Sequence, residues 1–433
     1  MPCRGECPLC AGCERKGPGA VCKPCARTQW LARRTESDNS PVDDSDADDC
    51  VMKRLSQCLV PLLLLVLSGC AASLPPPDPA QWVRDCRASP IPMPTTDDGG
   101  GPLLFATTRL PDCRAGSFTM SVERSDVMRL GWYEADAAVK PGDPVTPNLA
   151  NEEDWWTTLA AQLARGQGRV LLFVHGYNNN FASPAVRLRM MRAAGEFRGP
   201  AILFAWPSQD AVLKYPWDET NVDWTQAYLN VMIRRLARDP AVNEIVLVGH
   251  SMGSRSVIDA MEVLDAAGLA KVRTVILASP DVDRDRFSQI IQGIPGRAGV
   301  VSGERHYTVY LSAKDSAIGI SRRIHHYPRL GSPFCFGKDK FARCYPKPSP
   351  VLDVVDTSWV SKSDLGHNDF LDSPQAAEDL KQALQGKSGP LPGRLPAVSG
   401  IDDDPVGDGI WRLCPTEGCA RTKGKKAKVT TSG

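Results

Sequence analysis

A regular alternation of short apolar runs with longer segments of helical periodicity is the feature that most constrains the fold of this chain. Apolar runs at 169–174, 201–206 and 245–248 alternate with segments at about 181–197 and 222–238, in which apolar residues recur at helical spacing. Strands that are apolar throughout are typical of parallel sheets covered by helices on both faces. We therefore predict an α/β fold with a mostly parallel, doubly wound sheet.

The alternation continues on either side of this core. The other predicted elements are strands at 103–107, 117–122, 273–277, 306–311 and 351–355, and helices at about 254–267 and 374–384. We expect the first two strands to be antiparallel entry strands. The predicted folded domain is 102–385, preceded by a linker rich in Pro, Asp and Gly at 70–101 and followed by a flexible tail at 386–433.

A further apolar segment lies outside this domain and predicts where the protein resides. Two basic residues follow Met52 and precede an apolar run at 59–67, which is much shorter than the roughly 20 residues that span a bilayer. The run ends in Leu-Ser-Gly followed by Cys70, which resembles a bacterial lipobox. We predict that 52–69 is a lipoprotein signal peptide and that acylated Cys70 anchors the chain on the periplasmic side of the envelope. An uncleaved anchor and a buried helix are the alternatives.

A signal peptide at this position leaves residues 1–51 to be explained. One interpretation is a misassigned start, with translation beginning at Met52. The other is a genuine cysteine-rich extension, whose CxxC spacings suit zinc. The cysteines concerned are Cys7, Cys10, Cys13, Cys22 and Cys25.

The cysteines after Cys70 indicate the kind of compartment in which the protein resides, and the charge balance indicates which class of partner it lacks. Six cysteines follow Cys70, an even number that fits an oxidising compartment. The sequence-local pairings are Cys86 with Cys113, Cys335 with Cys344, and Cys414 with Cys419. Lys and Arg number 51 against 50 Asp and Glu, so the chain has no excess positive charge to hold a nucleic-acid backbone. We expect no nucleic-acid partner.

The pentapeptide Gly249-His250-Ser251-Met252-Gly253 follows a predicted strand and opens a predicted helix. Gly-x-Ser-x-Gly in this setting is the arrangement that lifts a serine hydroxyl above the sheet. Its glycines leave room for the sharp turn that such a serine needs. We predict that Ser251 is a nucleophile. The alternative is a serine that only caps the helix.

A serine hydroxyl needs a base, and the base needs an orienting carboxylate. In this setting the order along the chain is Ser, then Asp or Glu, then His in a loop after the last strand. Of the six histidines, His367 meets that condition, with an exposed loop histidine as the alternative. For the carboxylate we predict Asp315, at the end of a predicted strand, with Asp281 and Asp283 as competitors. All three aspartates have helix capping as their alternative role.

The tetrahedral intermediate of acyl transfer requires two donors aimed at its oxygen, and backbone N–H groups serve because they are fixed in advance. We predict the N–H groups of Met252, directly after the nucleophile, and of Tyr177, in the turn His175-Gly176-Tyr177. We expect His175 to support this loop. The residues expected to cap the following helix are Asn178, Asn179 and Asn180.

Together these motifs resemble a bacterial family of α/β hydrolases of uncharacterised function, of the DUF900 type and often described as esterase-like or lipase-like. The matching stretches are 104–109, 173–181, 204–208, 249–255, 278–283 and 365–367. The resemblance implies the α/β-hydrolase fold and a Ser-Asp-His triad, without a substrate. The family's Ala-Pro-Asp form appears here as Ala278-Ser279-Pro280-Asp281, which leaves the role of Asp281 open.

We predict a serine hydrolase that cleaves a small acyl ester or a lipid through an acyl-enzyme intermediate, with neither metal nor organic cofactor. A phospholipase or acyltransferase is a second enzymatic interpretation, and a non-catalytic envelope binding protein with this fold belongs to another class. We also expect a lid at 325–350, stapled by Cys335 and Cys344. The aromatic residues that would border an acyl site are Trp206, Tyr215, Trp217 and Trp224.

Overall fold

The computed structural model describes part of the chain. The described residues are 93–94, 101–113, 118–134, 145–294, 297–298, 305–334, 345–346, 349–362, 365–397 and 409–415. All of them belong to the second of the two units into which the chain divides, Pro77–Gly433. The predictions for residues 1–51, the signal peptide at 52–69 and Cys70 lie outside the described residues, as do those for Cys86, Cys335, Cys344 and Cys419. Cys113 and Cys414 each form a disulfide.

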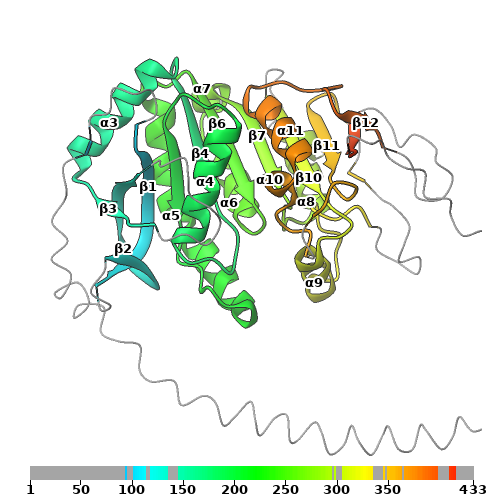
Figure 1. Cartoon of the computed structure of the whole chain (residues 1–433), viewed down its shortest axis with the longest axis horizontal. Helices are drawn as coiled ribbons and strands as arrows, with labels where there is room; N and C mark the ends of the chain where they lie inside the picture. The colour runs from blue at the N-terminus through cyan, green and yellow to red at the C-terminus, as the bar shows by residue number, and fades with distance from the viewer. Residues whose placement is uncertain are drawn as a thin grey trace, which may run out of the picture. The chain divides into compact units, whose positions relative to one another are not determined.

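An 11-stranded sheet with the order β12-β13-β11-β10-β7-β6-β4-β5-β1-β2-β3 forms the centre of this unit (Figure 1). The strands are β1 (Leu103–Asp112), β2 (Thr119–Tyr133), β3 (Asn148–Leu149), β4 (Arg169–Val174), β5 (Ala201–Ala205), β6 (Glu244–His250), β7 (Val272–Ala278), β10 (His306–Leu311), β11 (Leu352–Asp356), β12 (Arg394–Pro396) and β13 (Ile410–Leu413). From β1 to β13 by way of β5, β4, β6, β7, β10 and β11, neighbouring strands are parallel. The antiparallel pairs are β1 with β2, β2 with β3, and β12 with β13. The predicted fold class is confirmed.

Helices connect the strands and cover the sheet. They are α3 (Glu152–Arg165), α4 (Ala182–Ala194), the 3₁₀ helix η3 (Val212–Lys214), α5 (Tyr215–Arg238), α6 (Gly253–Glu262), α7 (Ala266–Lys271), α8 (Arg284–Gln292), α9 (Ser316–His325), α10 (Asp369–Asp372) and α11 (Pro374–Leu384). A separate hairpin joins β8 (Gly293–Ile294) and β9 (Arg297–Ala298). None of the helices in the described ranges is long and apolar enough to cross a bilayer.

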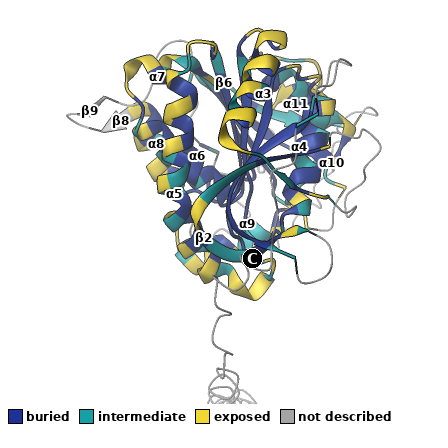
Figure 2. Cartoon of the chain, turned by 90° about the vertical axis from the view of Figure 1, so that its left-hand side faces the viewer, coloured by how far each residue is buried: buried dark blue, intermediate teal, exposed yellow. Residues whose placement is uncertain are grey.

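Strand β4 shows why the sheet has a core on each face. Val170, Leu172 and Val174 pack in one buried cluster with α3, α5 and α6, whereas Leu171 and Phe173 pack in the other with α4, α10 and α11. This alternation follows from the pleat, which points successive side chains to opposite faces. Figure 2 shows the buried strands in dark blue between helices whose outer faces are exposed. Because these strands are parallel, their carboxyl ends all lie at one edge of the sheet, and the loops at this edge carry the candidate site.

The prediction of a flexible tail at 386–433 is wrong for β12 and β13, which extend the sheet beside β11. Arg394 of β12 has a fully buried side chain that pairs with Asp379 at 2.6 Å and with Asp353 at 2.7 Å. Trp411 of β13 donates its indole N–H to Asp353 at 2.8 Å. Ion pairs with residues distant in the sequence attach this segment to the sheet. Because the segment consists largely of Gly, Pro and polar residues, its sequence shows no periodic pattern that would predict strands.

Other boundaries differ by part of an element. Helix α5 begins at Tyr215 rather than near residue 222, with Pro216 in its first turn, a position that tolerates proline because the N–H has no helical partner there. Strand β2 reaches Tyr133, beyond the predicted 117–122, and its irregular pairing with β1 accommodates the extra length. The predicted helix at 254–267 is divided into α6 and α7.

Candidate active site

Ser251 lies in the turn between β6 and α6 and has a φ of +52°, a left-handed conformation that costs energy for a residue with a side chain. Two glycines make this turn possible. A Cβ on Gly253 would lie 2.3 Å from the carbonyl oxygen of His175, and one on Gly249 would lie 2.7 Å from the Cα of Ser254. The N–H of Ser251 donates to the carbonyl of Ala278 at 2.9 Å, which fixes the turn to β7.

His367 and Asp315 are brought together at the same edge of the sheet. Nδ1 of His367 lies 2.8 Å from Oδ2 and 3.0 Å from Oδ1 of Asp315, and the carboxylate is fully buried. Gly366 has a φ of +65°, and a Cβ there would lie 2.6 Å from the backbone carbon of Lys314. This glycine therefore allows the histidine loop to approach the end of β10.

Asp315 also performs the role that was the alternative to a triad carboxylate. Its Oδ1 accepts a hydrogen bond from the N–H of Ile318 at 2.9 Å, so it caps helix α9. A carboxylate has about four acceptor positions and can serve a helix end and a histidine at once. The cap fixes the carboxylate in place for His367.

The other ring nitrogen of His367 is available. Nε2 is buried and has no hydrogen-bond partner among the described residues, where no hydrogen bond joins it to Ser251. Catalytic hydrogen bonds in structures without substrate are often long and tighten when substrate binds. Ser251 is itself only 2% exposed, so its hydroxyl lies within the protein rather than on its surface.

His250 lies against the histidine loop. Its ring centroid is 4.8 Å from that of His367, and its Nε2 lies 3.2 Å from the carbonyl oxygen of His367. Burial holds the pKa of His250 well below its usual value, so the ring is neutral at pH 7. Since a carbonyl only accepts, Nε2 carries the proton and His250 supports the loop from below.

Asp281, one of the two competing carboxylates, is occupied by other partners. Arg329 donates to its Oδ1 at 2.7 Å and Arg255 to its Oδ2 at 2.9 Å, while the hydroxyls of Tyr215 and Ser321 also donate to it. Burial opposes ionisation, but the two guanidinium groups outweigh it and hold the pKa of Asp281 well below its ordinary value. Its backbone N–H donates to the carbonyl of Ser251 at 3.1 Å.

Asp283, the other competitor, has the helix-capping role. Its Oδ1 accepts from the N–H groups of Asp285 and Arg286, both at 2.9 Å, at the start of α8. The structure thus brings Asp315 to His367 and engages the two competitors elsewhere.

The turn after β4 lies directly beside Ser251. A Cβ on Gly176 would lie 2.6 Å from the Cβ of Ser251, so only glycine permits this approach. Among the described residues, the backbone N–H groups of Tyr177 and Met252 have no hydrogen-bond acceptor. Two unoccupied amides near a serine hydroxyl are suited to receive an oxyanion.

His175 holds the base of this turn. Its ring stacks on Trp206 with centroids 4.9 Å apart and an interplanar angle of 5°, and the indole N–H of Trp206 donates to the carbonyl of His175 at 2.7 Å. Burial is the main cause that lowers the pKa of His175 to about 3. The ring is therefore neutral at pH 7, and its contacts are those of a supporting residue.

Asp218 stabilises the turn after β4, a role that the sequence did not predict. Its buried carboxylate accepts from the N–H of Asn178 at 3.0 Å, the N–H of Gln209 at 2.7 Å and the hydroxyl of Ser208 at 2.6 Å. Burial is the largest cause that raises its pKa. The only local signal is an acidic residue in the first turn of a helix, which usually indicates an interaction with the helix dipole.

Arg109 supports the same turn from β1. Its buried guanidinium donates to the carbonyls of Asn179 at 2.8 Å, Ser121 at 3.1 Å and Ser208 at 3.3 Å. Burial lowers its pKa to about 10, which leaves it charged at pH 7. Of the three asparagines, Asn180 accepts from the N–H of Ser183 at 3.0 Å in the first turn of α4, whereas Asn178 and Asn179 form the turn itself.

The four aromatic residues expected around an acyl group lie in different surroundings. Trp206 is fully buried under His175, and Trp217 is 59% exposed. Trp224 packs against Tyr228 on α5. Tyr215 is the one that contacts the candidate site, with its ring 5.2 Å from that of Tyr177.

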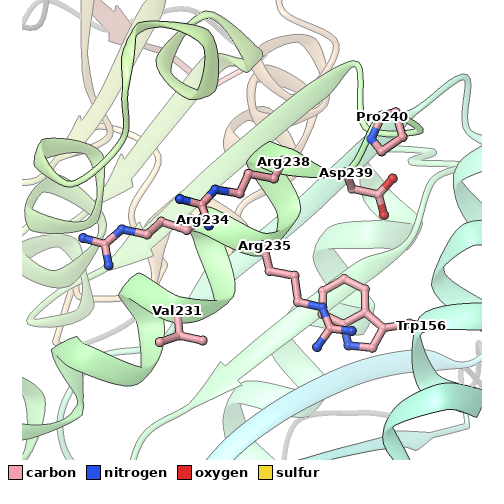
Figure 3. A pocket seen from close by; sticks show the side chains of 7 residues that line it. All are labelled: Trp156, Val231, Arg234, Arg235, Arg238, Asp239 and Pro240. Carbon is pink, nitrogen blue, oxygen red and sulfur yellow. The ribbon is translucent and has the colours of Figure 1, made fainter.

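Two hollows are lined by described residues, one beside the candidate site and one remote from it. One, of about 510 Å³, adjoins the histidine loop and is lined by Ser183, Val186, Arg187, Met190, Asn368, Leu371 and Asp372. The other, of about 640 Å³, is shown in Figure 3 and is lined by Trp156, Val231, Arg234, Arg235, Arg238, Asp239 and Pro240. It lies about four turns along α5 from Tyr215 and is therefore remote from Ser251. The described ranges contain no group of three or more His, Cys, Asp or Glu residues that could hold a metal ion.

A model of the family described as "Alpha/beta hydrolase of unknown function (DUF900)" matches residues 151–386. The match covers α3 to α11, including the Ser251 turn, Asp315 and His367. No curated protein matches the chain.

The chain is similar to several solved structures. One is a putative hydrolase of the alpha/beta superfamily from Xanthomonas campestris pv. campestris, with 12% identity and a TM-score of 0.26. That match covers 50% of this chain and 95% of the other, and the coverages below are given in the same order. The esterase LipW from Mycobacterium marinum has 12% identity and a TM-score of 0.28, covering 50% and 71%. A bacterial heroin esterase has 14% identity and a TM-score of 0.30, covering 74% and 96%. Likenesses this distant say nothing of substrate.

Proposed function

The chain belongs to the DUF900 family of alpha/beta hydrolases of unknown function, and on this premise we propose that it is a serine hydrolase that cleaves carboxylic esters. The observation that carries the proposal is the contact of His367 Nδ1 with both oxygens of Asp315, at the sheet edge where Ser251 occupies its strained turn. A carboxylate at Nδ1 favours the tautomer in which Nε2 is free to accept a proton.

In the proposed reaction, Oγ of Ser251 attacks the acyl carbonyl carbon while Nε2 of His367 takes the hydroxyl proton. The buried carboxylate of Asp315 stabilises the imidazolium that forms. His367 then gives the proton to the departing alcohol, and an ester bond to Ser251 remains. Water attacks that ester with His367 again as base, which releases the carboxylic acid and restores the serine. The sequence of steps uses neither metal nor organic cofactor.

The N–H groups of Tyr177 and Met252 are proposed to stabilise the oxyanion of each tetrahedral intermediate. Their lack of acceptors among the described residues supports this role. Donors of this kind accelerate the reaction because they are oriented before charge develops. Arg109 and Asp218, which hold the turn at Asn178 and Asn179, are positioning residues in this scheme.

A serine-directed fluorophosphonate probe tests the proposal. We expect the full chain, purified in detergent, to be labelled at Ser251, and labelling to be lost in Ser251→Ala. Ser254→Ala is the matched control, because Ser254 is also buried and lies three residues after Ser251, at the start of α6. Labelling that survives in Ser251→Ala, or no labelling of the wild-type chain, would contradict the proposed nucleophile. Hydrolysis of p-nitrophenyl esters of increasing chain length then measures the acyl preference.

We also propose that the enzyme is tethered to the bacterial envelope through acylated Cys70. This part rests on the sequence at 52–70 alone. Mass spectrometry of the amino terminus of protein extracted from membranes tests it. A lipid-modified Cys70 is the expected result, and an unmodified terminus at Met1 or Met52 would contradict the tether.

A further inference from the structure

Large apolar side chains that are exposed gather at the edge of the sheet that carries the candidate site. Ten such side chains occur among the described residues. Seven of them belong to η3, the first turn of α5, α9 with the residues that follow it, and the histidine loop. They are Val212, Leu213, Trp217, Ile320, Ile324, Tyr327 and Leu365. We call these seven residues the apolar rim.

Helix α9 contributes an ordered stripe to the rim. Ile320 and Ile324 are 51% and 54% exposed and lie four residues apart, which places them on one outer face of α9. Tyr327, which is 61% exposed, follows the end of the helix at His325. The buried residues of the helix, Ile318 and Ser321, face the protein. The outer face of α9 therefore presents two branched apolar side chains to solvent, where a helix usually carries polar residues.

The start of α5 lies beside α9 and continues the rim. Tyr215 contacts His325 with ring centroids 6.0 Å apart, and His325 Nε2 lies 2.9 Å from Glu219. Figure 1 shows α9 at the edge of the sheet below β10 and α8. In η3, Leu213 is 91% exposed, the largest exposure of any large apolar side chain in the described ranges.

The rim is attached to the groups of the proposed reaction. Helix α9 begins at the residue after Asp315, and the N–H of Ser316 donates to the carbonyl of Leu365 at 3.0 Å, two residues before His367. Trp217 precedes Asp218, the residue that holds the oxyanion turn. Anything that covers the rim therefore contacts the elements that hold Asp315, His367 and Asp218.

The charge around the rim selects the kind of partner. Between residues 316 and 331 there is no Asp or Glu, whereas Arg322 and Arg323 lie on α9 and Lys314 directly precedes Asp315. On the η3 side, Lys214 is balanced by the exposed Asp210. Glu219, near the start of α5, is paired with Arg255 and His325. The basic part of the rim is therefore α9. Exposed apolar residues combined with Lys and Arg are typical of helices that lie in the interface of an anionic bilayer. A second copy of the same basic face would repel this one, so self-association is disfavoured.

We propose that the apolar rim docks on an anionic lipid layer and that the enzyme takes its ester substrates from that layer. The docking surface stands on exposure, helical spacing and charge. The assignment of lipid esters as substrates rests on the proposed function.

Hydrogen exchange read by mass spectrometry tests the docking surface. The full chain carrying Ser251→Ala is reconstituted with vesicles of phosphatidylglycerol or of phosphatidylcholine, so that no turnover occurs. We expect slower exchange at 212–217 and 316–327 with phosphatidylglycerol than with phosphatidylcholine, and no change at α11. Because exchange is measured region by region, protection confined to the rim can be distinguished from the effect of a tether at Cys70, which acts on the whole chain.

Four results would overturn the proposal. The first is unchanged exchange at the rim with phosphatidylglycerol, and the second is equal protection of the rim and α11, which indicates adsorption without a preferred face. The third is rim protection that depends on protein concentration without vesicles, which indicates a second copy. Equal protection by both lipids would overturn the anionic layer as the partner.

Matched variants assign the protection to particular side chains. Ile320→Ser combined with Ile324→Ser should remove most of the protection at 316–327 and lower the rate on vesicle-borne esters by about tenfold or more, as expected for the loss of buried methylenes at ~0.8 kcal/mol each. Val231→Ser is the control, since Val231 is a helical residue of 56% exposure outside the rim. Equal behaviour of the two variants contradicts docking through α9. Protection without any hydrolysis by the wild-type chain contradicts only the proposed function.

Discussion

Two buried aspartates, Asp281 after β7 and Asp315 after β10, occupy equivalent places at the ends of neighbouring strands, yet their partners differ. Asp315 meets His367, whose charge changes when it takes a proton. Asp281 meets Arg255 and Arg329, whose charges are fixed. A carboxylate between two guanidinium groups serves structure, whereas one against a single imidazole can stabilise a charge that forms during a reaction. The comparison shows that the partner, rather than the place on the sheet, determines the role.

The largest expected effect follows from replacing Asp315 by Asn. The amide favours the wrong histidine tautomer, and kcat should fall by about 10⁴-fold, as for the equivalent change in a known Ser-His-Asp enzyme. Asparagine is as good a helix cap as aspartate, so α9 should remain folded. Steady-state ester hydrolysis measures the effect, with circular dichroism as the control for folding. A rate within tenfold of wild type would mean that Asp315 only caps α9.

Asp281→Asn should instead affect stability. The change leaves the buried guanidinium of Arg329 without its counter-charge, whereas Arg255 keeps its ion pair with Glu219. Removing one partner of a buried pair costs about 3–5 kcal/mol. The free energy of unfolding, measured in urea, should fall by that amount. Asp283→Asn is the matched control, because asparagine keeps the cap of α8 and surface changes of this kind usually stay within about 0.5 kcal/mol. Equal stability of the two variants would show that the Asp281 pairs contribute nothing.

The pH dependence of the free energy of unfolding should show the contribution of the Asp281 ion pairs. Because the pKa of Asp281 in the folded state lies well below its ordinary value, its contribution to the free energy of unfolding is complete above the unfolded pKa of about 3.9. That contribution is lost as the pH falls toward the folded pKa. The difference between wild type and Asp281→Asn should thus be constant at pH 5–8 and shrink below about pH 4. A difference that grows on acidification would contradict this sign.

The sequence was sufficient where a pattern is local. The run at 169–174 coincides with β4, because five consecutive apolar residues, 170–174, are typical of a parallel strand that is buried on both faces of the sheet. Ser251, Asp315 and His367 follow one another along the chain in the predicted order, and all three lie at one edge of the sheet. The expected strands at 273–277 and 306–311 likewise became β7 and β10, with a one-residue extension at each end of the first.

The sequence was insufficient where a partner is distant. Nothing near Asp281 indicates Arg329, which is 48 residues away, and nothing near Arg394 indicates Asp353, which is 41 residues away. The role of Asp218 depends on a backbone N–H 40 residues earlier in the chain. Buried ion pairs and carboxylate anchors leave no periodic pattern, so they can be found only once the chain is folded.

The smallest expected effect concerns Tyr215, which links the Asp281 cluster to Tyr177 in the turn after β4. Tyr215→Phe removes the hydroxyl that donates to Asp281 but keeps the ring against Tyr177. The lost hydrogen bond should lower the free energy of unfolding by about 1 kcal/mol, while kcat stays within about threefold because the ring still supports the turn. Tyr228→Phe, which loses an exposed hydrogen bond to the carbonyl of Asp126, is the control for stability. A large fall in kcat with unchanged stability would mean that the hydroxyl, and with it the Asp281 cluster, acts on the reaction itself.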